Sequence, residues 1–137
     1  MRALIKANYA SALVGKAANE TVELQPLALR LLCNCLSDAA GLEQALGHRA
    51  VETCITLLRS YDTAVRTEAS ATLATLCFAE AAKHAAIDGG AVPTLVDLLR
   101  DPDQATRTAA AAALVAVTTT DEGKRASVET NHWSRPD

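Results

Sequence analysis

The feature that most constrains this chain is an internal repeat with a period of about 41 residues. Residues 89–117 contain a Gly-Gly break, a short apolar segment that starts near a proline, a polar corner and a longer alanine-rich segment. Shifted back by one period, Leu98 falls on Leu57 and Arg107 falls on Arg66 without a gap. A unit of this length cannot bury its apolar face alone. The sequence therefore predicts a stack of similar units, each packed on its neighbours.

The composition indicates that these units are helical. Half of the 137 residues are hydrophobic, but only 3% are aromatic. Alanine and leucine carry the apolar content, which suits close-packed helices better than a β-sandwich, where β-branched and aromatic residues dominate. Apolar residues also recur at helical spacing within each unit. The predicted fold class is all-α.

The register predicts one repeat domain over residues 1–131, followed by an irregular tail at 132–137. A partial helix at 1–8 precedes about three units. Their predicted bounds are 9–49, 50–90 and 91–131. Short helices are expected at 9–18 and 50–59, and longer ones at 22–36, 64–78 and 105–117. One or two helical turns are expected at 41–46 and a connecting helix at 80–87, and residues 121–129 are expected to open a fourth unit.

Prolines and polar residues punctuate these helices. Pro26 and Pro93 are expected in first turns, where the missing N–H costs little. Asp62 or Thr63 is expected to cap the helix that follows it. The break at 47–49 corresponds to the break at 88–90, and glycine suits such corners because it adopts positive φ without a Cβ clash.

Charge and hydropathy narrow the class of function. The net charge of −3 and the pI near 5.6 give no basic footprint for nucleic acid. No apolar run approaches the roughly 18 residues of a membrane span, and Lys6, Asn8 and Lys16 interrupt any signal-peptide core near the start. The chain is therefore expected to be cytoplasmic. The four cysteines lie at or beside apolar repeat positions, where reduced cysteine acts as a small buried hydrophobe.

The sequence holds no recognisable catalytic or metal-binding pattern. His48, His84 and His132 are scattered in the register, and a Cys77–His84 pair would lack an orienting third group. Cys33 and Cys35 lack the spacing of a zinc pair, and no phosphate-binding glycine loop occurs. We expect no enzyme, no catalytic, cofactor-binding or metal residues, and no small-molecule substrate. A small helical enzyme or ligand-binding domain remains an alternative that would require a deep polar pocket.

The Gly-Gly-Ala-Val-Pro opening at 89–93, the apolar core at 95–99 and the period resemble the armadillo repeat. The resemblance covers residues 9–129 and implies a right-handed α-solenoid of about three units. Asp62 with Arg66, and Asp103 with Arg107, look like the Asp-to-Arg pairing of the related HEAT repeat. At i and i+4 such a pair supports one helix, and it can also join neighbouring units.

In this family the third helices line a concave groove that docks other proteins. The family pattern implies the groove positions Arg30, Asn34, Ser37, Thr67, Ala71, Thr75, Phe78, Thr108, Ala112, Ala116 and Thr119. Asn34 falls on the asparagine with which nuclear-import members bind peptide backbone, but Arg30 replaces its companion tryptophan. The later units replace both positions with alanine or threonine, which disfavours recognition of nuclear localisation signals.

The alanine- and threonine-rich groove suits a partner helix or strand that approaches closely. Alternatively, the alanines only allow tight packing of the third helices, with the partner on another surface. Phe78 is either an anchor for a partner or a plug over the next unit. Neither end of the stack shows a polar capping unit, so we expect the ends to be covered by partners or by further units of a longer protein.

Residues 109–129 resemble a unit of the armadillo-type radial spoke head proteins of cilia and flagella. The sequence as a whole thus predicts a non-enzymatic protein–protein scaffold without cofactors, which docks other proteins of a larger assembly through its groove and open ends. The radial spoke resemblance implies a place in the axoneme. The alternative is a cytoplasmic transport or signalling adaptor that binds an extended peptide.

Overall fold

The computed structural model describes residues 3–119, and within them the chain is entirely helical, with eight helices and no strand. The helices are α1 (Ala3–Asn19), α2 (Gln25–Cys35), α3 (Ala39–Gly47), α4 (Ala50–Leu57), α5 (Thr63–Leu76), α6 (Glu80–Asp88), α7 (Ala91–Leu98) and α8 (Gln104–Thr118). The all-α prediction is confirmed. The segment 121–129, which is expected to open a fourth unit, and the tail at 132–137 lie outside the described residues.

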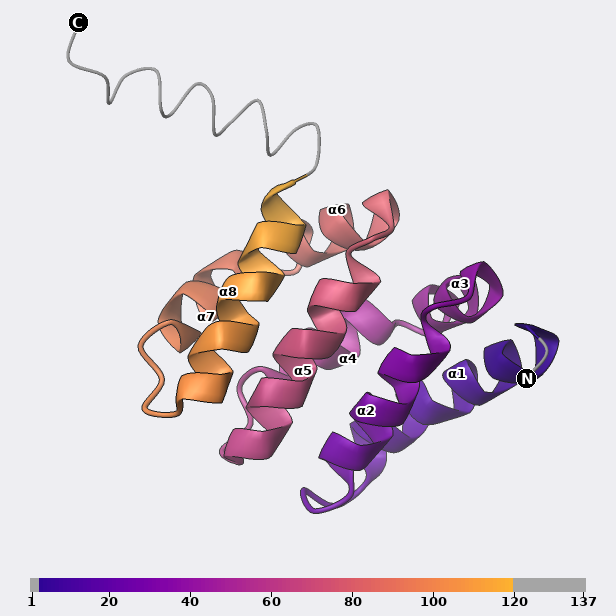
Figure 1. Cartoon of the computed structure of the whole chain (residues 1–137), viewed down its shortest axis with the longest axis horizontal. Coiled ribbons are helices and arrows are strands. Elements are labelled where there is room, and N and C mark those ends of the chain that lie inside the picture. Colours follow the sequence, from indigo (N-terminus) through magenta and orange to yellow (C-terminus); the bar gives the residue numbers. More distant parts are fainter. Residues whose placement is uncertain (1–2, 120–137) are drawn as a thin grey trace, which may run out of the picture.

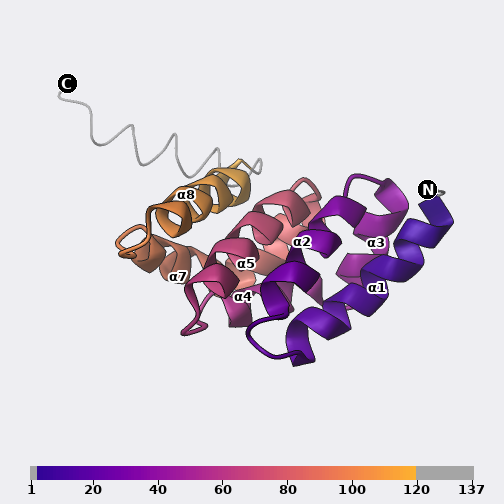
Figure 2. The ribbon, with the colours of Figure 1, turned by 60° about the horizontal axis from the view of Figure 1, so that its bottom comes forward.

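The helices form three successive repeats. Repeat 1 consists of α1 and α2, repeat 2 of α3, α4 and α5, and repeat 3 of α6, α7 and α8. The long helices α2, α5 and α8 lie side by side in one row, with α1, α4 and α7 behind them (Figure 1). The turned view shows the same row as a curved stack, with α1 and α8 at its two ends (Figure 2). The predicted solenoid is therefore present.

Repeat 1 departs from the sequence prediction at both of its helices. The described part of the expected partial helix, residues 3–8, and the expected helix at 9–18 form one continuous helix, α1. The reason is local: Ala7 and Asn8 stand where later repeats carry corner residues such as Gly89 and Gly90, so nothing interrupts the helix. Helix α2 begins at Gln25 rather than at residue 22, because residues 22–24 form a turn.

Two aspartates start the long helices of repeats 2 and 3 in the same way. Asp62 and Asp103 share the N-cap dihedral angles φ −87° and ψ 126°. The Asp62 carboxylate accepts the N–H of Val65 at 3.1 Å, and the Asp103 carboxylate accepts that of Thr106 at 2.9 Å. Each cap satisfies a backbone donor that the helix cannot. Asp62, rather than Thr63, is therefore the cap.

The corners before α4 and α7 both contain one left-handed residue. Gly90 has φ 80° and Arg49, one period earlier, has φ 64°. Gly47 lies inside α3, so the glycine of the predicted break is not the residue with positive φ. Because a side chain in this conformation clashes with the backbone, Arg49 is a strained position.

The core runs along the whole stack. Six leucines are among its largest fully buried side chains: Leu29, Leu32, Leu58, Leu73, Leu76 and Leu95. Smaller buried side chains such as Ala69, Ala110 and Ala113 allow the long helices to approach each other. None of the four cysteines forms a disulfide, and Cys33 alone among them is only partly buried.

An ion pair joins repeats 2 and 3. Arg66 donates from Nε to Asp101 Oδ2 at 2.9 Å, and both side chains are largely buried. Its Nη1 also donates to the carbonyls of Ser60 and Tyr61 at 3.0 Å. Arg66 does not pair with Asp62 inside one helix, because Asp62 caps that helix. The alternative, in which the arginine joins neighbouring units, holds for Arg66, but its partner is Asp101.

Candidate functional site: the face of α2, α5 and α8

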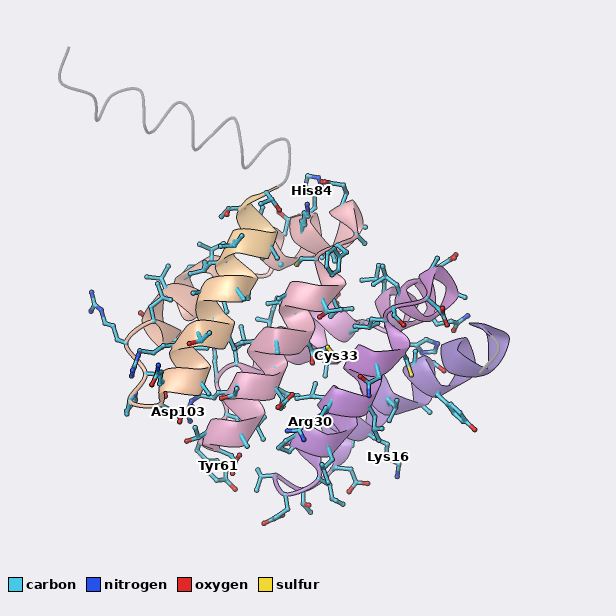
Figure 3. The ribbon with its side chains drawn as sticks, in the orientation of Figure 1. Lys16, Arg30, Cys33, Tyr61, His84 and Asp103 are labelled. Carbon is cyan, nitrogen blue, oxygen red and sulfur yellow. The ribbon has the colours of Figure 1, made fainter. Side chains whose placement is uncertain are left out.

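The face formed by α2, α5 and α8 carries the sequence-predicted groove positions, and some of them hold the helices together. Arg30 Nη2 of α2 donates to Glu68 Oε2 of α5 at 3.0 Å (Figure 3). Sequence reasoning placed no acid in this groove. Glu68 supplies one, but the Arg30 guanidinium compensates its charge.

Two predicted threonines also contact a neighbouring long helix. Thr67 Oγ1 lies 2.7 Å from Thr106 Oγ1 of α8. Thr75 Oγ1 accepts a hydrogen bond from Cys33 Sγ at 3.3 Å and donates to the Ala71 carbonyl at 3.2 Å. These hydroxyls are engaged within the protein, so Thr67 and Thr75 have a structural role whether or not a partner binds.

A hollow of about 380 Å³ lies between the C-terminal halves of α5 and α8. Five sequence-predicted groove residues line it: Thr75, Phe78, Ala112, Ala116 and Thr119. Phe78 is 82% exposed and Val115, which also lines the hollow, is 63% exposed. The exposed Phe78 is therefore not a plug buried under the next repeat. Two apolar side chains thus border a lining of small residues.

The remaining predicted positions lie apart from this hollow. Asn34 lines a second hollow of about 480 Å³ between α1 and α2 at the repeat 1 end of the stack. Ser37, just after α2, is exposed and donates to the Asn34 carbonyl at 3.3 Å. Thr108 is exposed on the N-terminal half of α8. The predicted set is thus one face of the stack rather than one compact site.

Sequence reasoning missed four residues that line the hollow between α5 and α8: Ala74, Cys77, Lys83 and Val115. Helical spacing could have identified Val115, because it lies at i+3 from Ala112 and at i−4 from Thr119. Nothing in the repeat pattern points to Lys83, which comes from α6. Its ammonium group pairs with Glu80 at 3.4 Å, and its side chain is 11% exposed. The hollow therefore has an apolar lining with one largely buried cation.

Burial determines the protonation state of the cysteine that lines this hollow. Burial raises the pKa of Cys77 to about 11, an effect that the nearby Lys83 only partly offsets. Its thiol is therefore protonated at neutral pH and is not an activated nucleophile. Within residues 3–119 no three histidine, cysteine or acidic side chains are grouped to hold a metal ion.

The third hollow, of about 390 Å³, lies between α1 and the start of α4 and includes His48, Arg49 and Glu52. Arg49 and Glu52 are both exposed and lie 3.7 Å apart as an ion pair. A polar pocket for a small ligand would be expected to bury its charged groups, whereas this hollow leaves Arg49 and Glu52 exposed.

No helix in the described part of the chain is long and apolar enough to cross a membrane.

These features define a helical solenoid in which α2, α5 and α8 form one open face. Residues 80–115, which cover α6, α7 and most of α8, match the model of the armadillo/beta-catenin-like repeat. The chain therefore contains an armadillo repeat, and the fold of its described residues is that of an armadillo solenoid. A search of curated proteins found no match.

Solved structures agree on this fold. An engineered protein with 30% sequence identity superposes with a TM-score of 0.81 over 94% of this chain and 53% of that one. Another engineered protein is 26% identical, with a TM-score of 0.77 over 94% of this chain and 61% of the other. A designed armadillo repeat protein in complex with the peptide (KR)4 is 22% identical, with a TM-score of 0.78 over 92% and 54%. The chain thus spans between half and two thirds of the length of each.

Proposed function

We propose that this chain is a protein-binding scaffold whose partner docks on the face of α2, α5 and α8, in the hollow between α5 and α8. The observation that carries the proposal is the pair of exposed apolar side chains, Phe78 and Val115, beside small residues. Exposed apolar side chains that border a hollow are typical of interaction sites. Helix-in-groove docking requires this combination of apolar anchors and small contacts.

The hollow also suggests what the partner presents. Its lining residues Ala112, Ala116 and Ala74 are small, so an aliphatic or aromatic side chain of the partner fits against them. The hydroxyls of Thr75 and Thr119 already donate to carbonyls of their own helices, at 3.2 and 2.9 Å. Specificity therefore depends on shape more than on hydrogen bonds. We infer an amphipathic helix with an apolar anchor.

Affinity capture from a cell extract tests this proposal, with the whole chain as bait. Phe78→Ala and Val115→Glu should each lose the partner, with a loss of affinity of at least about 2 kcal/mol if these side chains are hot spots. Tyr61→Ala is the matched control, because Tyr61 is an equally exposed aromatic (83%) just before α5, remote from the hollow (Figure 3). Asn34→Ala tests the hollow between α1 and α2. Equal recovery by Phe78→Ala, Val115→Glu and Tyr61→Ala would exclude the hollow.

A second candidate function is a transport or signalling adaptor that binds an extended basic peptide. It is favoured by Glu68, an acid on the same face, and by the structural likeness to a designed protein that is in complex with (KR)4. Against it stands the pairing of Glu68 with Arg30. If this function holds, Arg30→Ala should strengthen binding of a Lys-Arg peptide at low salt, because it exposes the Glu68 carboxylate. No binding by either form would exclude it.

A place in the ciliary or flagellar axoneme is the finer form of the scaffold proposal. It rests on the sequence resemblance of residues 109–129 to radial spoke head proteins, of which α8 supplies the first part. A tagged chain expressed in ciliated cells should then be retained in detergent-extracted axonemes. Replacement of 120–124 by a Gly-Ser segment should abolish that retention, and loss of the whole signal in both forms on extraction would exclude the role.

A further inference from the structure

The outer face of α2 exposes leucines at positions that later repeats bury. Leu24, Leu27 and Leu31 are each about half exposed. One period later the same positions belong to the face of α5 that packs on α2, where Val65 and Thr72 are fully buried. The leucine face of α2 is therefore the half of a repeat–repeat interface that receives a preceding long helix.

The opposite end of the stack exposes the other half of the same interface. Val96 and Leu99, at the end of α7, are 45% and 39% exposed. Their equivalents one period earlier, Ile55 and Leu58, are 8% and 1% exposed, because repeat 3 covers them. Val115 adds a third exposed apolar side chain on α8.

The internal interfaces predict which residues of the two ends would meet. Between α2 and α5, the side chain of Thr72 donates to the Leu29 carbonyl at 3.4 Å, and Arg30 contacts Glu68. Between α5 and α8, Thr67 contacts Thr106. In each pair, the residue of the earlier repeat has an equivalent in α8 and the residue of the later repeat has an equivalent in α2, one or two periods away. The contacts expected between α8 of one copy and α2 of another are therefore Ala111 with Leu31, Ala112 with Leu27, and Thr108 with Leu24.

The two ends are complementary in size and in polarity. In each of these pairs a leucine of α2 faces an alanine or threonine of α8, which is how ridges of one helix fit the grooves of another. None of the pairs opposes like charges, and none buries an unpaired charge. If α8 also carried bulky residues at these positions, it could not pack as closely on the leucines of α2.

Arg107 supplies independent support at the polar edge of this interface. Its Nη1 donates to the carbonyls of Asp101 and Pro102, as Arg66 Nη1 does to those of Ser60 and Tyr61. Arg66 then uses Nε and Nη2 to bind the next repeat, whereas those atoms of Arg107 make no hydrogen bond to any described residue.

A second copy would offer the missing acceptors. Two periods before Asp101, the partner of Arg66, stands Asn19, and it is followed by Glu20. Asn19 is the last residue of α1, and Glu20 follows it, where its carboxylate pairs with Lys16 at 3.2 Å. The Arg107 guanidinium of one copy would therefore meet the amide oxygen of Asn19 and the carboxylate of Glu20 of the next copy, and a carboxylate is an acceptor that a guanidinium binds strongly.

We propose that this chain associates head to tail with a second copy of itself, with α8 of one copy packed on α2 of the next. The interface continues the two repeat–repeat interfaces already present inside the chain. Because the contact joins two different surfaces and a solenoid does not close on itself, the expected product is an open row of copies whose length grows with concentration.

Sedimentation equilibrium of the whole chain tests the proposal. The average mass of the wild type should rise with concentration. Leu27→Glu should block the α2 end and Ala112→Glu the α8 end, and each should weaken self-association at least about tenfold, equivalent to about 1.4 kcal/mol. Both positions are exposed, so folding should be retained, and circular dichroism verifies this. Gln44→Glu, at an exposed position of α3, is the control that adds the same charge without an effect.

An equimolar mixture of the two blocked variants gives the decisive result. One intact α8 end and one intact α2 end remain, so the mixture should form a 1:1 dimer that does not grow further. A wild-type chain that stays monomeric would overturn the proposal. This holds whether another protein or the residues after 119 cover the two ends. A mixture that stays monomeric, or a blocked variant that still forms long rows, would overturn the head-to-tail pairing. Phe78→Ala should leave self-association intact, which separates this proposal from groove binding.

Discussion

Arg66 and Asp101 form the polar link between repeats 2 and 3, with the guanidinium Nε 2.9 Å from Oδ2 of the carboxylate. Asp101 also accepts the backbone N–H of Asp103 at 3.0 Å, so it orders the corner that precedes α8 as well. The same residue thus joins two repeats and helps to start the next long helix.

Replacement of Asp101 by asparagine should therefore lower the free energy of unfolding at neutral pH by about 1–3 kcal/mol, because it weakens charged hydrogen bonds at a largely buried site. Burial opposes ionisation, but the hydrogen bond from Asp103 and the hydrogen bond and charge of Arg66 together hold the pKa of Asp101 below its ordinary value of 3.8. Urea unfolding followed by circular dichroism measures the difference.

The pH dependence of that difference follows from the direction of the shift. A carboxylate whose pKa is lowered in the folded state contributes its full stabilisation above the pKa of the unfolded chain and loses it as pH falls toward the folded value. The gap between wild type and Asp101→Asn should be constant from pH 7 to about 5 and shrink below about pH 4. Asp97→Asn, at an exposed position of α7, should change stability by less than about 0.5 kcal/mol. A gap that grows on acidification would contradict the assignment.

Arg49 offers a second prediction, because its left-handed conformation is costly for a residue with a Cβ. Arg49→Gly should raise the free energy of unfolding by up to about 1 kcal/mol, since glycine adopts φ 64° without strain. The exposed pair with Glu52 contributes little to oppose this. Gly90→Ala, one period later, should do the reverse and destabilise by about 1 kcal/mol. If Arg49→Gly and Gly90→Ala changed the free energy of unfolding equally and in the same direction, the two corners would not be equivalent.

The period made the local parts of the fold predictable from the sequence. Asp62 was one of two candidates for the cap of its helix, and Asp103 was placed only in a corner, yet the two residues have the same cap geometry one period apart. The repeat period alone could not show that α1 is one continuous helix. That outcome depended on Ala7 and Asn8, which are compatible with a helix where later repeats have corners.

Contacts between repeats were less predictable, because they depend on how far the long helices rotate and cross. Arg30 was identified as a groove residue, but its partner Glu68 lies in the next repeat and was missed. The hollow between α5 and α8 contains Lys83 from α6, a residue that no spacing within α5 or α8 could have indicated. The face was thus predictable as a set of positions, while its charge balance and its hollows required the structure.

The cysteines provide a third prediction. Cys33 is partly exposed, whereas Cys54 is 1% exposed and its burial strongly raises the pKa of its thiol. Cys77 is also buried, with a pKa of about 11. At pH 8 a thiol reagent should therefore modify Cys33 first and reach Cys54 and Cys77 only on unfolding, because the thiolate is the reactive form. Cys33→Ser should remove the fast phase. Rapid modification of Cys54 in the folded chain would contradict its burial.

Two glycines give the last prediction, because they lie inside helices but differ in what surrounds them. A Cβ at Gly41 of α3 would collide with the carbonyl oxygen of Cys35 at the end of α2, whereas a Cβ at Gly15 of α1 would meet nothing within 4 Å. Gly41→Ala should therefore lower the free energy of unfolding by about 1–3 kcal/mol, since the backbone of α2 or α3 must move. Gly15→Ala should raise it by up to about 1 kcal/mol, because alanine loses less conformational entropy in a helix. Thermal and urea unfolding of both variants measure the contrast. A Gly41→Ala variant as stable as Gly15→Ala would mean that α3 does not approach the end of α2 so closely.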